Sequence, residues 1–389
     1  MKKLAIIETV ILVFLAGCAS APANNPPANT PANNSPSPTS PSPATSPSNF
    51  TTVGSMSAAR ASHTATLLPN GEVLIAGGLN GTQALASAEL YDPATKTFAA
   101  TGNMTTVRGG HTAILLPNGK VLIAAGSDGT QQLASAELYD PTTGMFAPTG
   151  GMKSARASAS AAVLPTPAVL LANGKVLFIG DDAEVYDPST GTFALAGPYA
   201  DTASILWNTA TLLPDGRVLL IGATYGAGVG AAELFDPQSG TFSITGPRTQ
   251  VELNTATLLT NGTVLVVTAS FDFSTDEVAV YDPASGTFTD IGNTIGYHGY
   301  SAAVRLADGT VLISGGEMIG GNGSSFTEVY FPSTRAFEAA GSMATGRQMH
   351  TSTLLPDGTV LITGGLSVYG FPSQMTSTAE IYTPRGPGM

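Results

Sequence analysis

The sequence is poor in cysteine, in charge and above all in positive charge. A single cysteine, Cys18, stands among 389 residues, so a disulfide framework and cysteine-based zinc or iron–sulfur sites are excluded. Charged residues make up 11% of the chain, against about 25% in a typical soluble domain. Lys and Arg number 15 against 27 Asp and Glu, giving a formal net charge of −12. Because affinity for phosphates requires clustered positive charge, we expect no nucleic-acid partner.

Several motifs of common enzyme classes are also missing. No Gly-rich phosphate loop precedes a helix, since no helical periodicity is visible, and no Gly-x-Ser-x-Gly nucleophile elbow occurs. The four histidines are dispersed along the chain, whereas a catalytic zinc requires three converging protein ligands. Acidic residues at 181–182 and 272–277 are candidates for calcium, but such residues on loops are more often solvated surface. We therefore expect no metal and no cofactor.

The first 18 residues have the pattern of an export signal. Lys2 and Lys3 precede a short apolar run, which Glu8 interrupts and which is too short to span about 30 Å of hydrocarbon. The run ends in Leu-Ala-Gly-Cys at 15–18, which resembles the bacterial lipobox. This resemblance implies cleavage after residue 17 and a lipid such as palmitate on Cys18. The alternative is a plain secretory signal with an incidental cysteine.

Residues 19–49 contain only Ala, Pro, Asn, Ser and Thr, so they have no large apolar side chain to bury. Such a composition is typical of an extended linker. We therefore divide the chain into a signal peptide (1–17), a linker that begins with lipidated Cys18 (18–49) and a folded domain (50–389). The expected location is the cell envelope, outer membrane, periplasmic or surface-exposed, with the lipid as the only membrane contact. In the sorting pattern of lipoproteins, Ala19 after the cysteine favours the outer membrane.

The folded domain consists of seven copies of one unit. Each unit reads as four strands, labelled a to d: runs like 63–68, 73–76, 88–91 and 98–102, with an Asn-Gly or Asp-Gly turn between a and b. Four-stranded units at this period predict an all-β, seven-bladed β-propeller. The turn glycines recur 42 to 55 residues apart, at Gly71, Gly119, Gly174, Gly216, Gly262, Gly309 and Gly358.

The distribution of strand d predicts how the ring closes. In six units a Phe is followed by Gly four residues later, but unit seven ends beyond its strand c at 379–382 without this pattern. The missing sequence stands at the other end of the domain, from Phe50 to Gly54. We therefore predict that this N-terminal segment pairs as the outer strand of the last blade and closes the ring.

The unit resembles a kelch repeat throughout 50–389. The resemblance rests on paired glycines after strand b, as at 77–78, on Glu-x-Tyr in strand c, as at 89–91, and on Arg-x-x-His before strand a, as at 60–63. Two departures are a Phe in place of the kelch Trp in strand d, and a fifth unit without the glycine pair or the Glu. The resemblance implies protein or glycan binding, although the superfamily includes galactose-oxidase-like enzymes and sialic-acid mutarotases. A copper-radical oxidase needs a Tyr cross-linked to Cys, and Cys18 lies outside the propeller.

Strand directions sort the loops onto two faces of the propeller. The a–b and c–d turns share one face and are short and alike, whereas the b–c and d–a loops share the other face and vary. Because functional residues concentrate on variable loops, we predict that the b–c/d–a face binds the ligand. Its b–c loops are 79–87, 127–134, 181–183, 223–231, 269–277, 317–326 and 366–378.

Two groups of side chains on that face are candidates for ligand binding. The arginines of Arg-x-x-His cluster on neighbouring units and would suit an anionic ligand such as a carboxylate. The alternative is that each arginine holds its own blade through backbone hydrogen bonds. Aromatic residues on the opposite sector would stack on sugars or anchor a protein, or else pack beneath the loops. The candidates are Arg60, Arg108, Arg156, Arg347, Trp207, Tyr225, Phe271 and Tyr369.

Together these patterns favour a monomeric, lipid-anchored scaffold that binds a glycan or a protein without catalysis. No catalytic residue is predicted. One alternative is a carbohydrate-active enzyme of the sialic-acid mutarotase type, for which the sequence offers no recognisable acid–base pair. The other is a purely structural surface protein.

Overall fold

The computed structural model describes residues 49–156, 166–201, 205–224, 230–246, 254–269, 275–318, 320–368 and 373–385. All of them belong to one compact unit, Asn49–Met389. The predicted signal peptide, Cys18 and nearly all of the linker lie outside the described residues, as do the candidate residues Tyr225, Phe271 and Tyr369. No helix among the described residues is long and apolar enough to cross a membrane.

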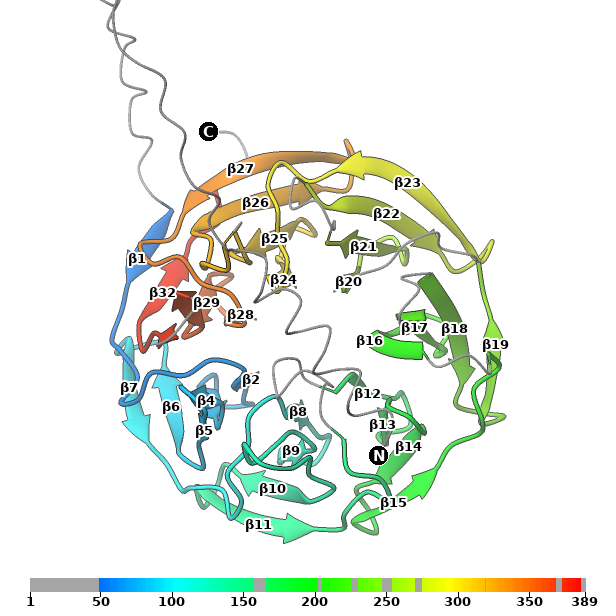
Figure 1. Ribbon diagram of the computed structural model, residues 1–389, viewed down its shortest axis with the longest axis horizontal. Helices are drawn as coiled ribbons and strands as arrows, with labels where there is room; N and C mark the ends of the chain where they lie inside the picture. Colours follow the sequence, from blue (N-terminus) through cyan, green and yellow to red (C-terminus); the bar gives the residue numbers. More distant parts are fainter. Residues whose placement is uncertain are drawn as a thin grey trace, which may run out of the picture. The chain divides into compact units, whose positions relative to one another are not determined.

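Seven four-stranded antiparallel sheets are arranged in a ring, as Figure 1 shows. This confirms the predicted all-β, seven-bladed propeller. Blades one to three are β2 (Thr64–Leu67), β3 (Val73–Ala76), β6 (Ala88–Asp92) and β7 (Thr97–Ala100); β8 (Thr112–Leu115), β9 (Val121–Ala124), β10 (Ala136–Asp140) and β11 (Met145–Thr149); and β12 (Ala168–Leu170), β13 (Val176–Phe178), β14 (Glu184–Asp187) and β15 (Thr192–Leu195).

Blades four to seven complete the ring, and two small hairpins extend from the b–c loops of blades one and seven. The hairpins are β4 (Leu79–Asn80) with β5 (Gln83–Ala84), and β30 (Leu366–Val368) with β31 (Gln374–Met375). The blades are β16 (Ile205–Leu212), β17 (Val218–Thr224), β18 (Gly230–Asp236) and β19 (Thr241–Ile244); β20 (Asn254–Leu258), β21 (Val264–Thr268), β22 (Glu277–Asp282) and β23 (Thr287–Asn293); β24 (Ala302–Arg305), β25 (Val311–Ser314), β26 (Phe326–Phe331) and β27 (Ala336–Ser342); and β28 (Thr351–Leu354), β29 (Val360–Thr363), β32 (Ala379–Tyr382) and β1 (Phe50–Thr52).

The ring closes through the N-terminal strand, as the sequence predicted. Strand β1 pairs antiparallel with β32, with Phe50 opposite Tyr382 and Thr52 opposite Glu380 (Figure 1). The rings of Phe50 and Tyr382 lie 5.1 Å apart, and Phe50 is buried against residues of blade six. The last blade therefore joins the two ends of the propeller in one sheet.

Strand b is apolar throughout because both of its faces are covered by neighbouring blades. In β3, Leu74 and Ala76 pack toward blade two, in a cluster with Val121 and Ile123. The alternating residues Val73 and Ile75 pack toward blade seven. Since side chains of a strand alternate between its faces, this arrangement gives the unbroken apolar run that the sequence shows.

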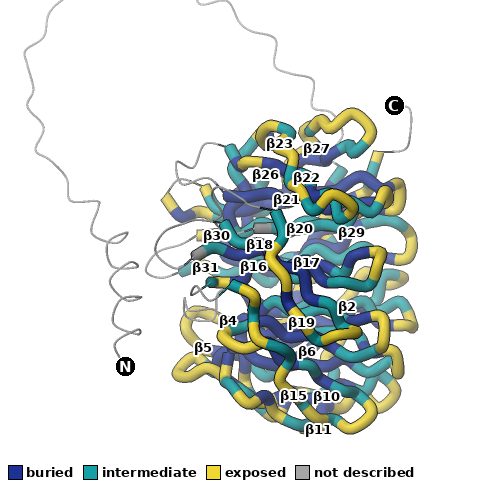
Figure 2. Tube along the Cα trace, turned by 90° about the vertical axis from the view of Figure 1, so that its right-hand side faces the viewer, coloured by how far each residue is buried: buried dark blue, intermediate teal, exposed yellow. Residues whose placement is uncertain are grey.

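The two faces of the disc differ in their connections. The a–b and c–d turns form what we term the turn face, and the b–c and d–a loops form the loop face. Figure 2 shows the hairpin strands β4, β5, β30 and β31 together on one side, which is the loop face. Because Phe50 pairs with the last residue of β32, Asn49 lies on the turn face, where its carbonyl accepts the Thr383 N–H at 2.8 Å.

Candidate functional site

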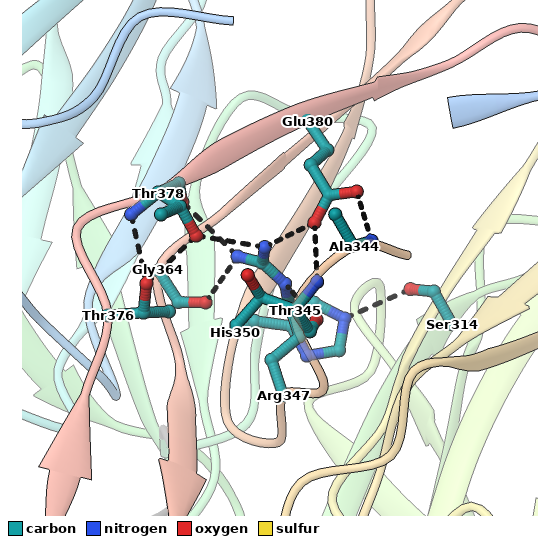
Figure 3. A network of polar contacts seen from close by, with 9 residues as sticks. All are labelled: Ser314, Ala344, Thr345, Arg347, His350, Gly364, Thr376, Thr378 and Glu380. Atoms are coloured by element: carbon teal, nitrogen blue, oxygen red, sulfur yellow. Dashed lines mark hydrogen bonds and ion pairs between the residues drawn. The ribbon is translucent and has the colours of Figure 1, made fainter. Parts of the chain in front are cut away.

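Arg347 holds together the two ends of the b–c loop in blade seven (Figure 3). Its Nη1 donates to the carbonyl oxygens of Gly364, at 2.8 Å, and Thr378, at 3.2 Å, which lie at the two ends of that loop. Its Nη2 donates to Glu380 of β32 at 2.6 Å. Burial lowers the pKa of Arg347, and the adjacent Glu380 carboxylate opposes that shift. The guanidinium thus joins the two ends of the b–c loop in its own blade.

The same arrangement, which we term the arginine lock, recurs in blades one, two and three. In each, a guanidinium donates to a carbonyl at the base of the b–c loop and pairs with the Glu of strand c. The side chains of these glutamates also accept backbone N–H groups, as Glu89 does from Ser57 at 2.9 Å. The locks are Arg60 with Gly77 (2.7 Å) and Glu89 (2.9 Å), Arg108 with Ala125 (2.9 Å) and Glu137 (2.9 Å), and Arg156 with Asp182 (2.8 Å) and Glu184.

These contacts bear directly on the role predicted for the four arginines. Arg60, Arg108 and Arg347 are 0% exposed and Arg156 is 5% exposed. Each guanidinium is neutralised by a buried carboxylate rather than directed to solvent. The contacts are those of the alternative interpretation, in which each arginine holds its own blade, and they give no support to a grip on an anionic ligand.

In blade six a histidine takes the place of the arginine. His298 Nδ1 lies 2.8 Å from the Gly315 carbonyl oxygen, and Nε2 lies 3.0 Å from Oε1 of Glu328. Its backbone N–H donates to Asp276 Oδ2 at 2.8 Å. Burial acts to lower the pKa of His298, but the hydrogen bond and charge of Glu328 outweigh it, so the pKa is raised. In the sequence, His298 stands three residues before Ser301, as Arg347 stands three residues before His350, but this spacing alone does not predict the contacts of its ring.

The histidines of Arg-x-x-His link each blade to the preceding one. The ring nitrogen Nε2 of His63 lies 2.9 Å from Thr363 in β29, and that of His111 lies 2.9 Å from Thr64 in β2. A Cβ on Gly364 would approach the His63 ring to 2.7 Å, which explains why the glycine pair is needed there. Burial lowers the pKa of His111 to about 3, so this ring is neutral.

The b–c loops of blades six, seven, one and two brace one another. The Gly323 N–H donates to the Ser367 carbonyl at 2.9 Å, which joins the loops of blades six and seven. The Gly81 N–H lies 3.2 Å from Met375 Sδ, which joins the loops of blades one and seven. A Cβ on Gly129 would lie 3.2 Å from the Thr82 carbonyl oxygen, so the loops of blades one and two also touch.

We term the described residues of these four loops (317–318, 320–326, 366–368, 373–378, 79–87 and 127–134) the loop platform. Hydrogen bonds from Thr130 and Gln131 lower the pKa of the platform residue Asp128 to about 2, whereas burial raises the pKa of Glu317. Among its described residues the exposed surface is mainly amide, hydroxyl and apolar. The exposed side chains are Asn80, Thr82, Gln83, Thr130, Gln131, Gln132, Met318, Asn322, Val368 and Gln374.

The one aromatic candidate that the structure describes lies beneath the loops. Trp207 is 8% exposed and belongs to the core cluster between blades three and four. Its ring lies 5.3 Å from that of Tyr199, whose hydroxyl donates to the Gly180 carbonyl at 2.9 Å. Trp207 therefore packs as the alternative interpretation expected, and little of it is accessible to a ligand.

Seven four-stranded blades that radiate around a ring, closed by the N-terminal strand, define a seven-bladed β-propeller. The repeat also matches the family model of the Kelch motif over residues 60–105. The chain is therefore a seven-bladed β-propeller whose first repeat carries a Kelch motif.

One solved structure with a similar fold is that of a novel fungal alcohol oxidase with catalytic diversity among the AA5 family, in complex with copper. The two chains share 15% sequence identity, and the match covers 86% of this chain and 75% of that one with a TM-score of 0.63. At this identity the likeness shows the fold alone. A search of curated protein sequences finds no match.

The copper of that enzyme prompts the question whether this chain offers comparable ligands. Within the described part of the chain, no group of three His, Cys, Asp or Glu side chains could hold a metal ion. The histidine rings are instead engaged in contacts between blades or with Glu328. The only cysteine, Cys18, lies outside the described residues. The described residues therefore do not provide such a copper site.

Proposed function

We propose that this protein is a non-catalytic binding scaffold that holds a glycan or protein ligand on the loop platform. The observation that carries the proposal is the bracing of four neighbouring b–c loops by one another and by the locks beneath them. A surface that is ordered before binding loses less conformational entropy when its ligand arrives. The propeller core supplies the rigid support that such a surface needs.

The mutarotase-type alternative receives less support. Recognition of a sugar carboxylate generally uses accessible guanidinium or ammonium groups. The arginines that suggested this activity are buried and paired with glutamates. A purely structural protein remains the competing interpretation, and it differs from ours in predicting no ligand at all.

The binding test compares equivalent substitutions on the two faces. Gln83→Ala combined with Gln374→Ala removes two platform amides that are exposed to solvent. The matched control is Gln238→Ala in the c–d turn of blade four, on the turn face. Binding is measured on a glycan array and by cross-linking to cell-envelope proteins. We expect the platform variant alone to lose the ligand while its thermal midpoint stays that of the wild type; no ligand in either assay contradicts the proposal.

We also propose that the protein is exported and anchored in the cell envelope through lipidated Cys18. The support is the lipobox-like sequence at 15–18. In addition, Asn49, the first described residue after the predicted linker, lies on the turn face, opposite the loop platform. Metabolic labelling with an alkynyl fatty acid should mark the wild-type protein but not Cys18→Ser. The variant should also leave the membrane fraction, and unlabelled wild-type protein would contradict the anchor.

A further inference from the structure

The loop platform contains no positively charged residue. Its four loops carry no Lys or Arg at any position of their sequences, but they contain Asp128 and Glu317. Hydrogen bonds hold the pKa of Asp128 at about 2, so that carboxylate is charged near neutral pH. The platform itself therefore presents negative charge and no cation to an approaching anion. Among the described residues, the one exposed lysine of the loop face is Lys153, in the d–a loop beside Glu184 of blade three.

The arginines nearest to the platform cannot supply this cation. Arg60, Arg108 and Arg347 lie beneath it with 0% exposure, and each pairs with a buried glutamate at 2.6–2.9 Å. Breaking such a pair leaves an uncompensated charge in the protein interior, which is strongly destabilising. A ligand that recruited one of these guanidinium groups would therefore have to disrupt the loop that it binds.

The scarcity of cations is specific to this surface and does not simply follow from the acidic composition. The turn face carries several basic side chains that are at least partly exposed, so the fold accommodates exposed cations elsewhere. They are Lys96, Lys120, Lys175, Arg217, Arg305, Arg335 and Arg385.

The exposed polar groups of the platform suit hydroxyl-rich ligands. Amide side chains such as Gln83 and Gln374 each offer both donors and an acceptor, which matches sugar hydroxyls that donate and accept. Met318, 51% exposed, and Val368, 37% exposed, add apolar contact area. Trp, Tyr and Arg dominate the binding energy of protein interfaces, and none of them is exposed among the described platform residues.

We propose that the ligand of the loop platform is an uncharged glycan, and this inference rests on the proposed binding function. The negative charge of the platform disfavours uronic, sulfated, phosphorylated and sialylated glycans, because their anionic groups would be repelled by its carboxylates. The amides and hydroxyls of neighbouring loops supply the attractive contacts.

The test presents the full chain, extracted in detergent, with immobilised neutral polysaccharides (glucan, mannan, galactan and arabinan) and anionic ones (polygalacturonate, alginate and heparin). We expect binding to at least one neutral polymer, with an affinity that changes less than about twofold with salt. Gln83→Ala with Gln374→Ala should weaken this binding about tenfold or more, and Gln238→Ala should leave it unchanged.

Other outcomes separate this inference from the function on which it rests. Preferred binding to an anionic polymer that weakens with salt overturns the inference but keeps a ligand-binding platform. Cross-linking of a protein to the platform, lost in the double variant and without glycan binding, also overturns the inference and keeps the proposed function. Absence of both glycan and protein binding overturns the two together.

Discussion

The imidazole of His298 in blade six occupies the position that the guanidinium of Arg347 occupies in blade seven. His298 Nδ1 lies 2.8 Å from the Gly315 carbonyl oxygen, as Arg347 Nη1 lies 2.8 Å from that of Gly364. Each side chain also pairs with the glutamate of its own strand c. Because an arginine stays charged at physiological pH while a histidine titrates there, one of the locks depends on pH.

We expect this lock to make the propeller less stable as the pH rises above neutrality. The pKa of His298 is raised in the folded protein. Its stabilising contribution is therefore complete below the unfolded-state pKa of about 6.5 and is lost as the pH passes the folded-state value. His298→Arg should retain stability over this alkaline range. Thermal midpoints measured from neutral to mildly alkaline pH test this expectation.

A reciprocal variant serves as the control for His298. Arg347→His places a titratable lock in blade seven and should steepen the alkaline loss of stability. The idea is wrong if wild type and His298→Arg lose stability in parallel above neutral pH.

The opposite pH dependence is expected from the histidines between the blades. Burial and nearby arginines lower the pKa values of His63, His111 and His350, to about 3 for the last two. The unfolded chain therefore binds protons that the folded chain does not. Stability should fall below pH about 6.5, by up to about 1.4 kcal/mol per pH unit for each histidine.

His111→Asn tests the acid effect, because blade four carries Asn208 at the corresponding position of its sequence. We expect a cost at neutral pH from the lost contact with Thr64, but a shallower decline of the unfolding free energy in acid. Urea unfolding at several pH values provides the slope. An unchanged slope would mean that the His111 ring already binds a proton in the folded state.

Removing an arginine of the locks should destabilise the blade severely. Arg347→Met leaves Glu380 buried without its ion pair, and we expect a loss of about 3–5 kcal/mol. Adding Glu380→Gln should recover part of this loss because it removes the uncompensated charge. Chemical denaturation of the single and double variants measures the coupling. A single variant within about 1 kcal/mol of wild type would exclude a substantial contribution of the lock.

The repeat could be predicted because its turn and strand patterns each span only a few residues. The closing strand could be predicted because counting these patterns showed which unit lacks strand d. An Asn-Gly turn, an apolar strand b and a Phe-x-x-x-Gly strand d each appear within a few residues. The absence of the last pattern from unit seven pointed to Phe50, which the structure pairs with Tyr382. Such features require only strand periodicity and turn chemistry.

The character of the site was less accessible to sequence reasoning. Whether Arg347 reaches solvent or turns inward depends on Glu380 and Gly364, which lie on other strands and are identified as partners only by packing. The bracing of the platform follows no repeat, since the contact between Gly81 and Met375 joins residues 294 positions apart. The repeat therefore located the loop face correctly but did not reveal which of its side chains are exposed.

One hydrogen bond between blades recurs at three junctions but is missing where the ring closes. At these junctions a threonine of strand d contacts the tyrosine hydroxyl of the next strand c. In the closing blade, Val53 stands at the position of that threonine, and the Tyr91 hydroxyl is buried without a hydrogen-bond partner in the described structure. The pairs are Thr101–Tyr139, Thr149–Tyr186 and Thr245–Tyr281, each at 2.9 Å.

We therefore expect Val53→Thr to stabilise the closed ring by about 0.5–1.5 kcal/mol, the usual net value of one such bond. The gain should arise from the new contact with Tyr91 and should disappear in a Tyr91→Phe background. Tyr91→Phe alone should cost little, because its hydroxyl makes no bond to lose. Urea unfolding of the four proteins in this cycle measures the coupling. A gain from Val53→Thr that persists without the Tyr91 hydroxyl would show that the threonine acts through another contact.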